Sequence, residues 1–243
     1  MSFISVILAE GQKVKRSLFW KIHIVTPIIG AALFALYFVI YHNVDEYRKM
    51  QLILELIAMA FPLLIGIIIG INIMIEEKSS HFQSMLAVPN RINIFMAKLF
   101  MLFGSGILSL ICMSLLFVLS ISILGVKDNL SISTLVYALI GIAFVNFTIY
   151  VWHLFVNLKF GQGISLFLAV FECLQCVLYS NIELQGMWRY IPFSWSINWI
   201  HDILNGNLLY TKKEWGINII FMLCFLTIVL KWFEHWEGRK SYE

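Results

Sequence analysis

The chain has 243 residues, of which 60% are hydrophobic and only 13% are charged, and its mean hydropathy is +0.86. Soluble domains carry roughly 25% charged residues, so this composition excludes a soluble globular protein and indicates an integral protein of the lipid bilayer. The net charge of +3 is too small to point to nucleic acid as a partner.

The first 21 residues are predicted to form an amphipathic helix that lies in the inner interface of the membrane. Its apolar residues fall on one helical stripe, namely Ile4, Ile7, Leu8 and Leu18. Glu10, Lys13 and Arg16 lie off that stripe, as expected for a helix that rests on a bilayer surface. The alternative is that this basic stretch only sets the topology of the chain.

Six apolar segments are predicted to be transmembrane helices. A helix needs about 20 apolar residues, at about 1.5 Å each, to cross roughly 30 Å of hydrocarbon. The segments that meet this condition are residues 22–41, 52–75, 99–124, 135–156, 164–179 and 216–233. We therefore expect an all-α, polytopic membrane protein in which residues 1–243 form one transmembrane domain.

The Lys and Arg residues predict the orientation of these spans. The segments on one side, which include both termini and residues 76–98, hold 11 of the 17 basic residues. Because short loops rich in Lys and Arg stay in the cytoplasm, both termini and residues 76–98 are expected to face the cytosol.

The loop between the second and third spans, residues 76–98, reads EEKSSHFQSMLAVPNRINIFMAK. Phe82, Met85 and Leu86 recur at helical spacing, and Pro89 ends the helix that they predict. A short amphipathic helix at one membrane face is what a transport subunit needs to receive force from a soluble partner. The loop is therefore predicted to be a coupling helix.

Residues 180–215 are predicted to be an extracellular or re-entrant segment that is rich in aromatic side chains. Ser194 is a candidate cap for a short helix that ends at Asn205-Gly206. Trp and Tyr favour the membrane interface, so this segment either anchors the chain or contacts a substrate.

Glu172 lies near the middle of the fifth span, where a carboxylate costs about 3 kcal/mol on insertion scales. One interpretation is a substrate pathway that Glu172 lines together with Asn146 and Gln175. The other is an interhelical hydrogen bond from Glu172 to Asn146. In the second span, Gly66 and Gly70 predict close packing with another helix, either of this chain or of another subunit.

Catalytic motifs are missing from the sequence. It contains no GxxxxGK[ST] phosphate loop, no HExxH, no GxSxG and no zinc-ligand cluster. Its four cysteines lie in apolar runs, so the CxxC spacing of Cys173 and Cys176 is interpreted as apolar packing. We expect no catalytic residue, cofactor or metal. One enzymatic alternative is a faint similarity of Glu76-Glu77, His81 and His153 to intramembrane proteases of the prenyl-protein-processing type, although His81 stands where those have arginine.

The combination of a basic amphipathic N-terminus, six spans, a structured inner loop and a re-entrant-looking segment resembles the permeases of type-2 ABC exporters. In the loop, Glu77 follows the second span, a leucine-proline element runs from Leu86 to Pro89, and Arg91 leads into the third span. Ser79-Ser80 replace the usual glycine. The resemblance implies docking on a separate ATPase, with Glu76, Glu77 and Arg91 setting the register and Phe82, Met85 and Leu86 supplying apolar contact.

Within that superfamily the chain is most similar to lantibiotic-immunity permeases of the epidermin and mutacin type. The similarity rests on AEGQKVKRS at Ala9–Ser17 and TPIIG at Thr26–Gly30. It implies a bacterial cytoplasmic-membrane exporter that contains an ATPase and a second small permease and that expels an antimicrobial peptide. The alternatives are a permease for another drug or antibiotic, or an accessory or sensory membrane protein that moves nothing.

Overall fold

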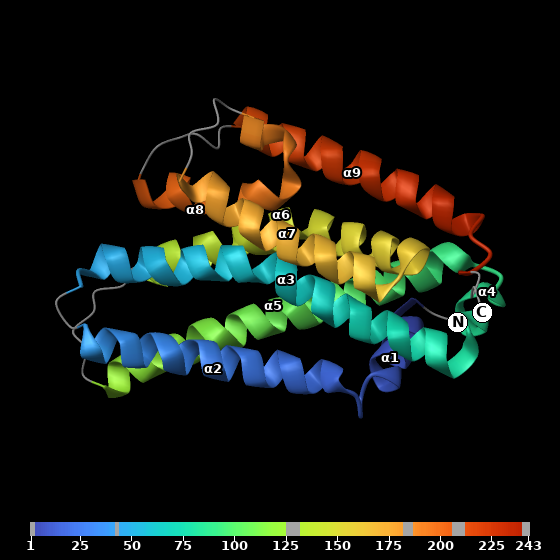
Figure 1. Ribbon diagram of the computed structural model, residues 1–243, viewed down its shortest axis with the longest axis horizontal. Helices are drawn as coiled ribbons and strands as arrows, with labels where there is room; N and C mark the ends of the chain where they lie inside the picture. Colours follow the sequence, from blue (N-terminus) through green and yellow to red (C-terminus); the bar gives the residue numbers. More distant parts are fainter. Residues whose placement is uncertain (1–2, 42–43, 125–131, 182–186, 206–211, 240–243) are drawn as a thin grey trace.

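The computed structural model describes residues 3–41, 44–124, 132–181, 187–205 and 212–239. Long helices run side by side along the molecule (Figure 1). These are α2 (Leu18–Ile40), α3 (Glu46–Ser80), α5 (Arg91–Ile123), α6 (Ile132–Phe160), α7 (Gln162–Asn181) and α9 (Lys212–Glu234). The shorter elements are α1 (Phe3–Lys13), α4 (Gln83–Leu86), η1 (Met187–Tyr190), η2 (Pro192–Ser194) and α8 (Trp195–Asn205).

The expectation of an all-helical, polytopic membrane protein is confirmed. Five of the described helices are long and apolar enough to cross a membrane: α2, α3, α5, α6 and α9. The predicted fifth span corresponds to α7, whose apolar part is shorter. The outward faces of α2 and α9 carry exposed Ile28, Leu33, Ile220 and Leu223, and such apolar surface suits contact with hydrocarbon.

Several helices extend beyond the predicted apolar segments because capping residues, and not hydropathy, set their ends. The Asp45 side chain accepts a hydrogen bond from Arg48 N, so α3 begins before its first apolar run. Asn90 accepts from Asn93 N in the same way, and α5 therefore includes the basic residues that precede the third span.

The N-terminal helix is shorter than predicted. α1 ends at Lys13, and the Ser17 hydroxyl caps α2 by accepting from Phe19 N. Ile4 and Leu8 are exposed on α1, as expected for an apolar stripe that faces lipid. Glu10, which we placed on the solvated side, is instead buried against the bundle.

The helices form two groups. The first group consists of α1, α2 and α5, with α5 packed along both of the others. The second group consists of α3, α6, α7 and α8, in which α3 contacts the other three. The contacts of α2 with α3 and of α5 with α6 join the groups along a seam, and α9 lies against α5 and α6.

α6 and α7 form a tight helical hairpin. Gly161 alone separates them, and its φ of +96° is a left-handed conformation that suits glycine. Contacts between residues of the two helices show that α7 runs back along α6.

α8 lies at the opposite end of the molecule from α4 and packs into the second group (Figure 1). Its Trp199 Nε1 donates a hydrogen bond to the carbonyl of Ala138 on α6. The indole also lies against Gly141 of α6, where an added Cβ would be closer than 3.0 Å to it. The predicted helix after Ser194 is present, but the Ser194 hydroxyl donates to the carbonyls of Trp188 and Ile191 and does not cap α8. Residues 182–186 and 206–211 of the predicted outer segment, including Gly206, lie outside the described residues.

Candidate functional site

The loop between α3 and α5 contains the predicted short helix, α4. His81 and Phe82 both have positive φ values, 47° and 67°, and they reverse the chain at the end of α3. A left-handed conformation costs a residue other than glycine about 1 kcal/mol, so the surrounding contacts must hold this turn in place. Pro89 lies between the end of α4 at Leu86 and Asn90, which caps the start of α5 at Arg91.

The apolar side of α4 faces the protein itself. Phe82 and Met85 are buried, and the Phe82 ring meets the Trp236 ring edge-on with centroids 5.2 Å apart. Leu86 is half-buried. We expected these three residues to contact an ATPase, but in this conformation the chain covers Phe82 and Met85. The exposed side of the loop is formed by His81, Gln83, Ser84, Ala87, Val88, Pro89 and Asn90.

Residues 235–239, here called the C-terminal strap, hold the loop from the other side. Arg91 Nη1 donates to the carbonyls of Glu234 and Trp236, at 3.1 and 2.9 Å. Arg239 Nη2 lies 2.9 Å from Glu77 Oε2. Two of the three residues predicted to set the docking register, Glu77 and Arg91, are thus engaged with the C-terminal end of the chain. No local sequence pattern connects residue 91 with residue 236, so the sequence analysis missed this contact.

Four charged side chains gather beneath the loop, and we call them the charge cluster: Glu10, Lys13, Glu76 and Lys98. Lys98 Nζ contacts the Glu10 carboxylate, and it lies 2.9 Å from Glu76 Oε1 and 3.0 Å from Asn72 Oδ1. Lys13 Nζ lies 2.6 Å from Glu10 Oε1 and 2.8 Å from Glu76 Oε1. The cluster therefore joins α1, α3 and α5.

Three of the four side chains of the charge cluster are buried, while Lys13 reaches it from the surface, and its charges balance. The exposed fractions of Glu10, Glu76 and Lys98 are 3%, 1% and 0%. Two carboxylates face two ammonium groups, which is the condition under which buried charges are tolerated. Burial lowers the pKa of Lys13, but its hydrogen bonds to Glu10 and Glu76 outweigh burial and raise that pKa above its ordinary value.

Ser84 connects the coupling helix to this cluster. Its hydroxyl donates to Glu76 Oε2 at 2.7 Å, so α4 is tied directly to the carboxylate that also binds Lys13 and Lys98. Glu76 was predicted to set the docking register, yet its side chain points into the protein. Glu10, Lys13 and Lys98 were not predicted as site residues, because no spacing rule relates the Glu10–Lys13 pair of α1 to Glu76 or Lys98, which lie more than 60 positions away.

Glu172 belongs to a second buried polar cluster, between α6 and α7. Its Oε2 lies 2.9 Å from His153 Nε2, and His153 Nδ1 lies 2.8 Å from Ser165 Oγ. An interhelical contact of Glu172 is therefore present, but with His153 and not with Asn146. The Asn146 amide donates to Ser196 Oγ on α8 at 2.7 Å, and Gln175 is half-buried. Glu172 and Asn146 therefore have different hydrogen-bond partners, on α6 and α8 respectively.

Gly66 and Gly70 allow α7 to approach α3. A Cβ at Gly66 would lie 2.5 Å from Ala169 Cβ and 3.3 Å from the His153 ring. A Cβ at Gly70 would lie 2.9 Å from Gln162 Cγ. The close packing predicted from these glycines therefore has its partner within this chain.

Comparison with known proteins identifies the family to which this chain belongs. The sequence model described as ABC-2 family transporter protein matches residues 6–175. The chain belongs to this family. No curated protein and no solved structure matches it. The matched residues run from α1 into α7, so they include the coupling loop and all four residues of the charge cluster.

As an ABC-2 family protein, the chain is a membrane component of an ABC transporter, a class of subunit that is typically not catalytic and works with an ABC ATPase. Among the described residues there is no group of three or more His, Cys, Asp or Glu side chains that could hold a metal ion. Glu76 and His153, the main residues of the hydrolase alternative, belong to the two separate clusters described above.

Proposed function

We propose that this ABC-2 permease exports its substrate by transmitting the movement of a separate ATPase subunit through the coupling loop. The observation that carries this proposal is the link from Ser84 on α4 to Glu76, and from Glu76 to Lys98 on α5. A load on α4 would reach the ends of both spans that flank the loop. It would also reach α1 through Glu10 and Lys13.

The docking surface in this proposal is the exposed side of the loop, centred on His81, Gln83 and Val88. The buried side, with Phe82 and Met85, would hold α4 in position against the bundle. Changing Phe82 to a charged residue is still expected to break ATPase association, because a buried charge would displace α4 from its packed position against the bundle. Val88 lies on the surface, so a change there tests docking without disturbing the packing of Phe82 and Met85.

Co-purification with the ATPase tests this assignment. We expect Val88→Asp to reduce recovery of the ATPase at least about tenfold, equivalent to about 1.4 kcal/mol of binding. The matched control is Tyr190→Ala, which changes an exposed side chain near the α8 end of the chain and should leave recovery unchanged. Full recovery of the ATPase with Val88→Asp, together with normal ATP hydrolysis, would show that the loop is not the docking surface.

We propose further that the substrate is a lantibiotic-type antimicrobial peptide and that the complex contains a second small permease. The support is the similarity of Ala9–Ser17 and Thr26–Gly30 to lantibiotic-immunity permeases. The proposed location is the bacterial cytoplasmic membrane, with both termini in the cytosol, as the distribution of Lys and Arg predicts.

Immunity assays in a sensitive bacterium test the substrate. Cells that produce the chain with its ATPase and second permease should tolerate a lantibiotic, and cells with an ATPase lacking its phosphate-loop lysine should not. Protection against an unrelated antibiotic alone would favour a different drug as substrate. Assembly of the complex without protection against any compound would favour the accessory or sensory role.

A further inference from the structure

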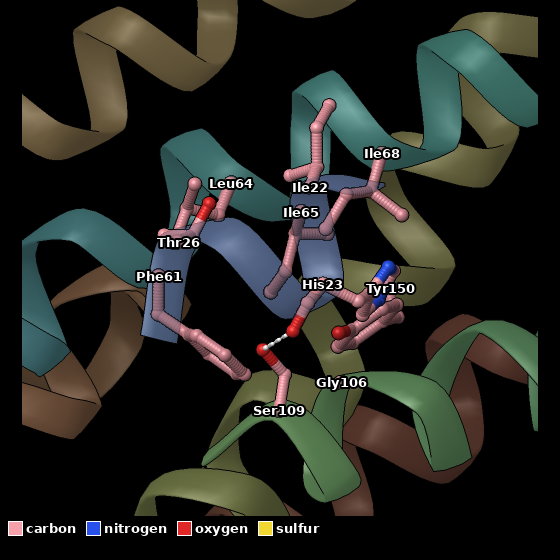
Figure 2. A pocket seen from close by; sticks show the side chains of 10 residues that line it. All are labelled: Ile22, His23, Thr26, Phe61, Leu64, Ile65, Ile68, Gly106, Ser109 and Tyr150. Atoms are coloured by element: carbon pink, nitrogen blue, oxygen red, sulfur yellow. Dashed lines mark hydrogen bonds between the residues drawn. The ribbon is translucent and has the colours of Figure 1, made fainter. Parts of the chain in front are cut away.

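A small cavity lies on the seam between the two helix groups. Its volume is about 20 Å³. Residues of four helices line it, α2, α3, α5 and α6 (Figure 2). The α3 wall is wholly apolar and includes Phe61 and Ile65, so the polar groups of this cavity come from the other three helices.

His23 of α2, which lines this cavity, carries an unpaired polar atom. The residue is 5% exposed, and its Nδ1 lies 2.8 Å from the carbonyl oxygen of Phe19. Because a carbonyl only accepts, Nδ1 carries the hydrogen, and Nε2 of the neutral ring is left with a lone pair. Nε2 is buried and has no hydrogen-bond partner among the described residues. A buried polar atom without a partner costs about 1–3 kcal/mol.

Tyr150 of α6 reaches the same cavity from the second helix group. It is 1% exposed, and its hydroxyl lies against Gly106 of α5, where an added Cβ would be closer than 3.0 Å to Oη. Ser109, one turn further along α5, donates its hydroxyl to the His23 carbonyl at 3.2 Å (Figure 2). The oxygen of Ser109 therefore keeps lone pairs that can still accept.

We propose that this cavity is a binding site for one water molecule, which bridges His23 Nε2 to the Tyr150 hydroxyl. The water would donate one hydrogen to Nε2, accept from the Tyr150 hydroxyl, and direct its second hydrogen to Ser109 Oγ. A buried water needs about 10–15 Å³ and typically makes about three hydrogen bonds. The volume of the cavity suffices for one water molecule and for no larger ligand, and His23, Ser109 and Tyr150 are among the polar side chains that line it.

The bridge would join the two helix groups at a place where their side chains otherwise meet through apolar contacts. His23 belongs to the first group and Tyr150 to the second. A water molecule can follow either side chain through small displacements, whereas a direct hydrogen bond loses strength once its angle falls. The seam could therefore shift slightly without leaving His23 Nε2 unpaired.

A double-mutant cycle on the full-length chain in detergent tests the coupling. We expect His23→Leu and Tyr150→Phe each to lower the Tm, because each leaves its former partners short of a hydrogen bond. The double variant should have a Tm no lower than that of the less stable single variant. Tyr137→Phe, which removes the hydroxyl of an exposed tyrosine on the same helix, is the control and should not change the Tm. Additive losses in the double variant would overturn the proposal.

A cryo-EM map of the assembled complex, at a resolution where water is visible, tests the water itself. Density within hydrogen-bond distance of His23 Nε2 and Tyr150 Oη would support the site, and it should disappear in the double variant. A direct hydrogen bond between the two side chains, or a cavity without density, would overturn it.

Discussion

The two ends of the molecule are held together by different chemistry. At the coupling end, which comprises α4 and the charge cluster, four elements meet through ion pairs and the Ser84 hydrogen bond. At the aromatic end, which comprises α8 and its surroundings, the indoles of Trp188, Trp195 and Trp199 pack around Val145. Trp199 and Trp215 meet edge-on, with ring centroids 4.8 Å apart.

This difference indicates which end can change state. Apolar and aromatic contacts depend mainly on buried area, and they weaken gradually when groups move apart. Buried ion pairs require their partners in a defined geometry, so a displaced α4 would have to settle in a second, equally well-paired arrangement. We therefore expect the coupling end to switch between discrete arrangements while the aromatic end stays fixed.

Among the variants proposed here, Lys98→Met should lower the thermal stability of the protein most, because it breaks the ion pairs of the coupling end. It leaves the carboxylates of Glu10 and Glu76 buried, with Lys13 as the one cation of the cluster that still contacts them. Breaking a buried ion pair costs about 3–5 kcal/mol, which should appear as a large loss of Tm in detergent. Lys78→Met, at an exposed lysine near the same end of α3, is the control. Equal Tm values for the two variants would mean that the charge cluster contributes nothing to stability.

Gly141→Ala should disturb the aromatic end by an intermediate amount. The new methyl group would collide with the Trp199 indole, and overpacking of this kind typically costs about 1–3 kcal/mol. Thermal unfolding measures the loss, and Gly163→Ala, at a helical glycine with open space around it, is the matched control. ATPase co-purification should survive Gly141→Ala, since the change lies far from α4. Loss of the ATPase would contradict the separation of the two ends.

Arg239→Ala should change the Tm least among these variants, but it should lower the rate of ATP hydrolysis that the substrate stimulates. Its contact with Glu77 is partly solvated, and such pairs contribute about 0–1 kcal/mol. The strap would nevertheless lose an anchor on the loop, so ATP hydrolysis stimulated by the substrate should fall while the Tm stays nearly constant. An unchanged stimulated rate would indicate that the strap has no part in coupling.

The sequence predicted the spans well because apolar length is a local property. The short helix at Gln83–Leu86 and the packing role of Gly66 and Gly70 also followed from local patterns, although the helix ends at Leu86, before the predicted stop at Pro89. The positions of helix ends were less accurate, because a single cap such as Ser17 or Asp45 can start a helix within a polar stretch.

The contacts that define the candidate site could not be predicted in the same way. Phe82 and Met85 were correctly recognised as one apolar side, but hydropathy does not reveal whether such a side meets a partner or the chain itself. Lys98 contacts Glu10, which lies 88 positions away in the sequence, and Arg91 donates a hydrogen bond to Trp236, which lies 145 positions away. Glu172 was expected to need a partner, and the choice of His153 over Asn146 depended on how α7 folds back on α6.

The one-residue turn at Gly161 has a consequence for how the protein is made. A helix carrying Glu172 would enter the bilayer alone only at a cost of about 3 kcal/mol for the charged group. Because Gly161 folds α7 directly onto α6, the carboxylate can meet His153 before either helix leaves the insertion machinery. We expect α6 and α7 to be inserted together as a preassembled hairpin, and a lengthened turn should slow biogenesis more than it weakens the finished protein.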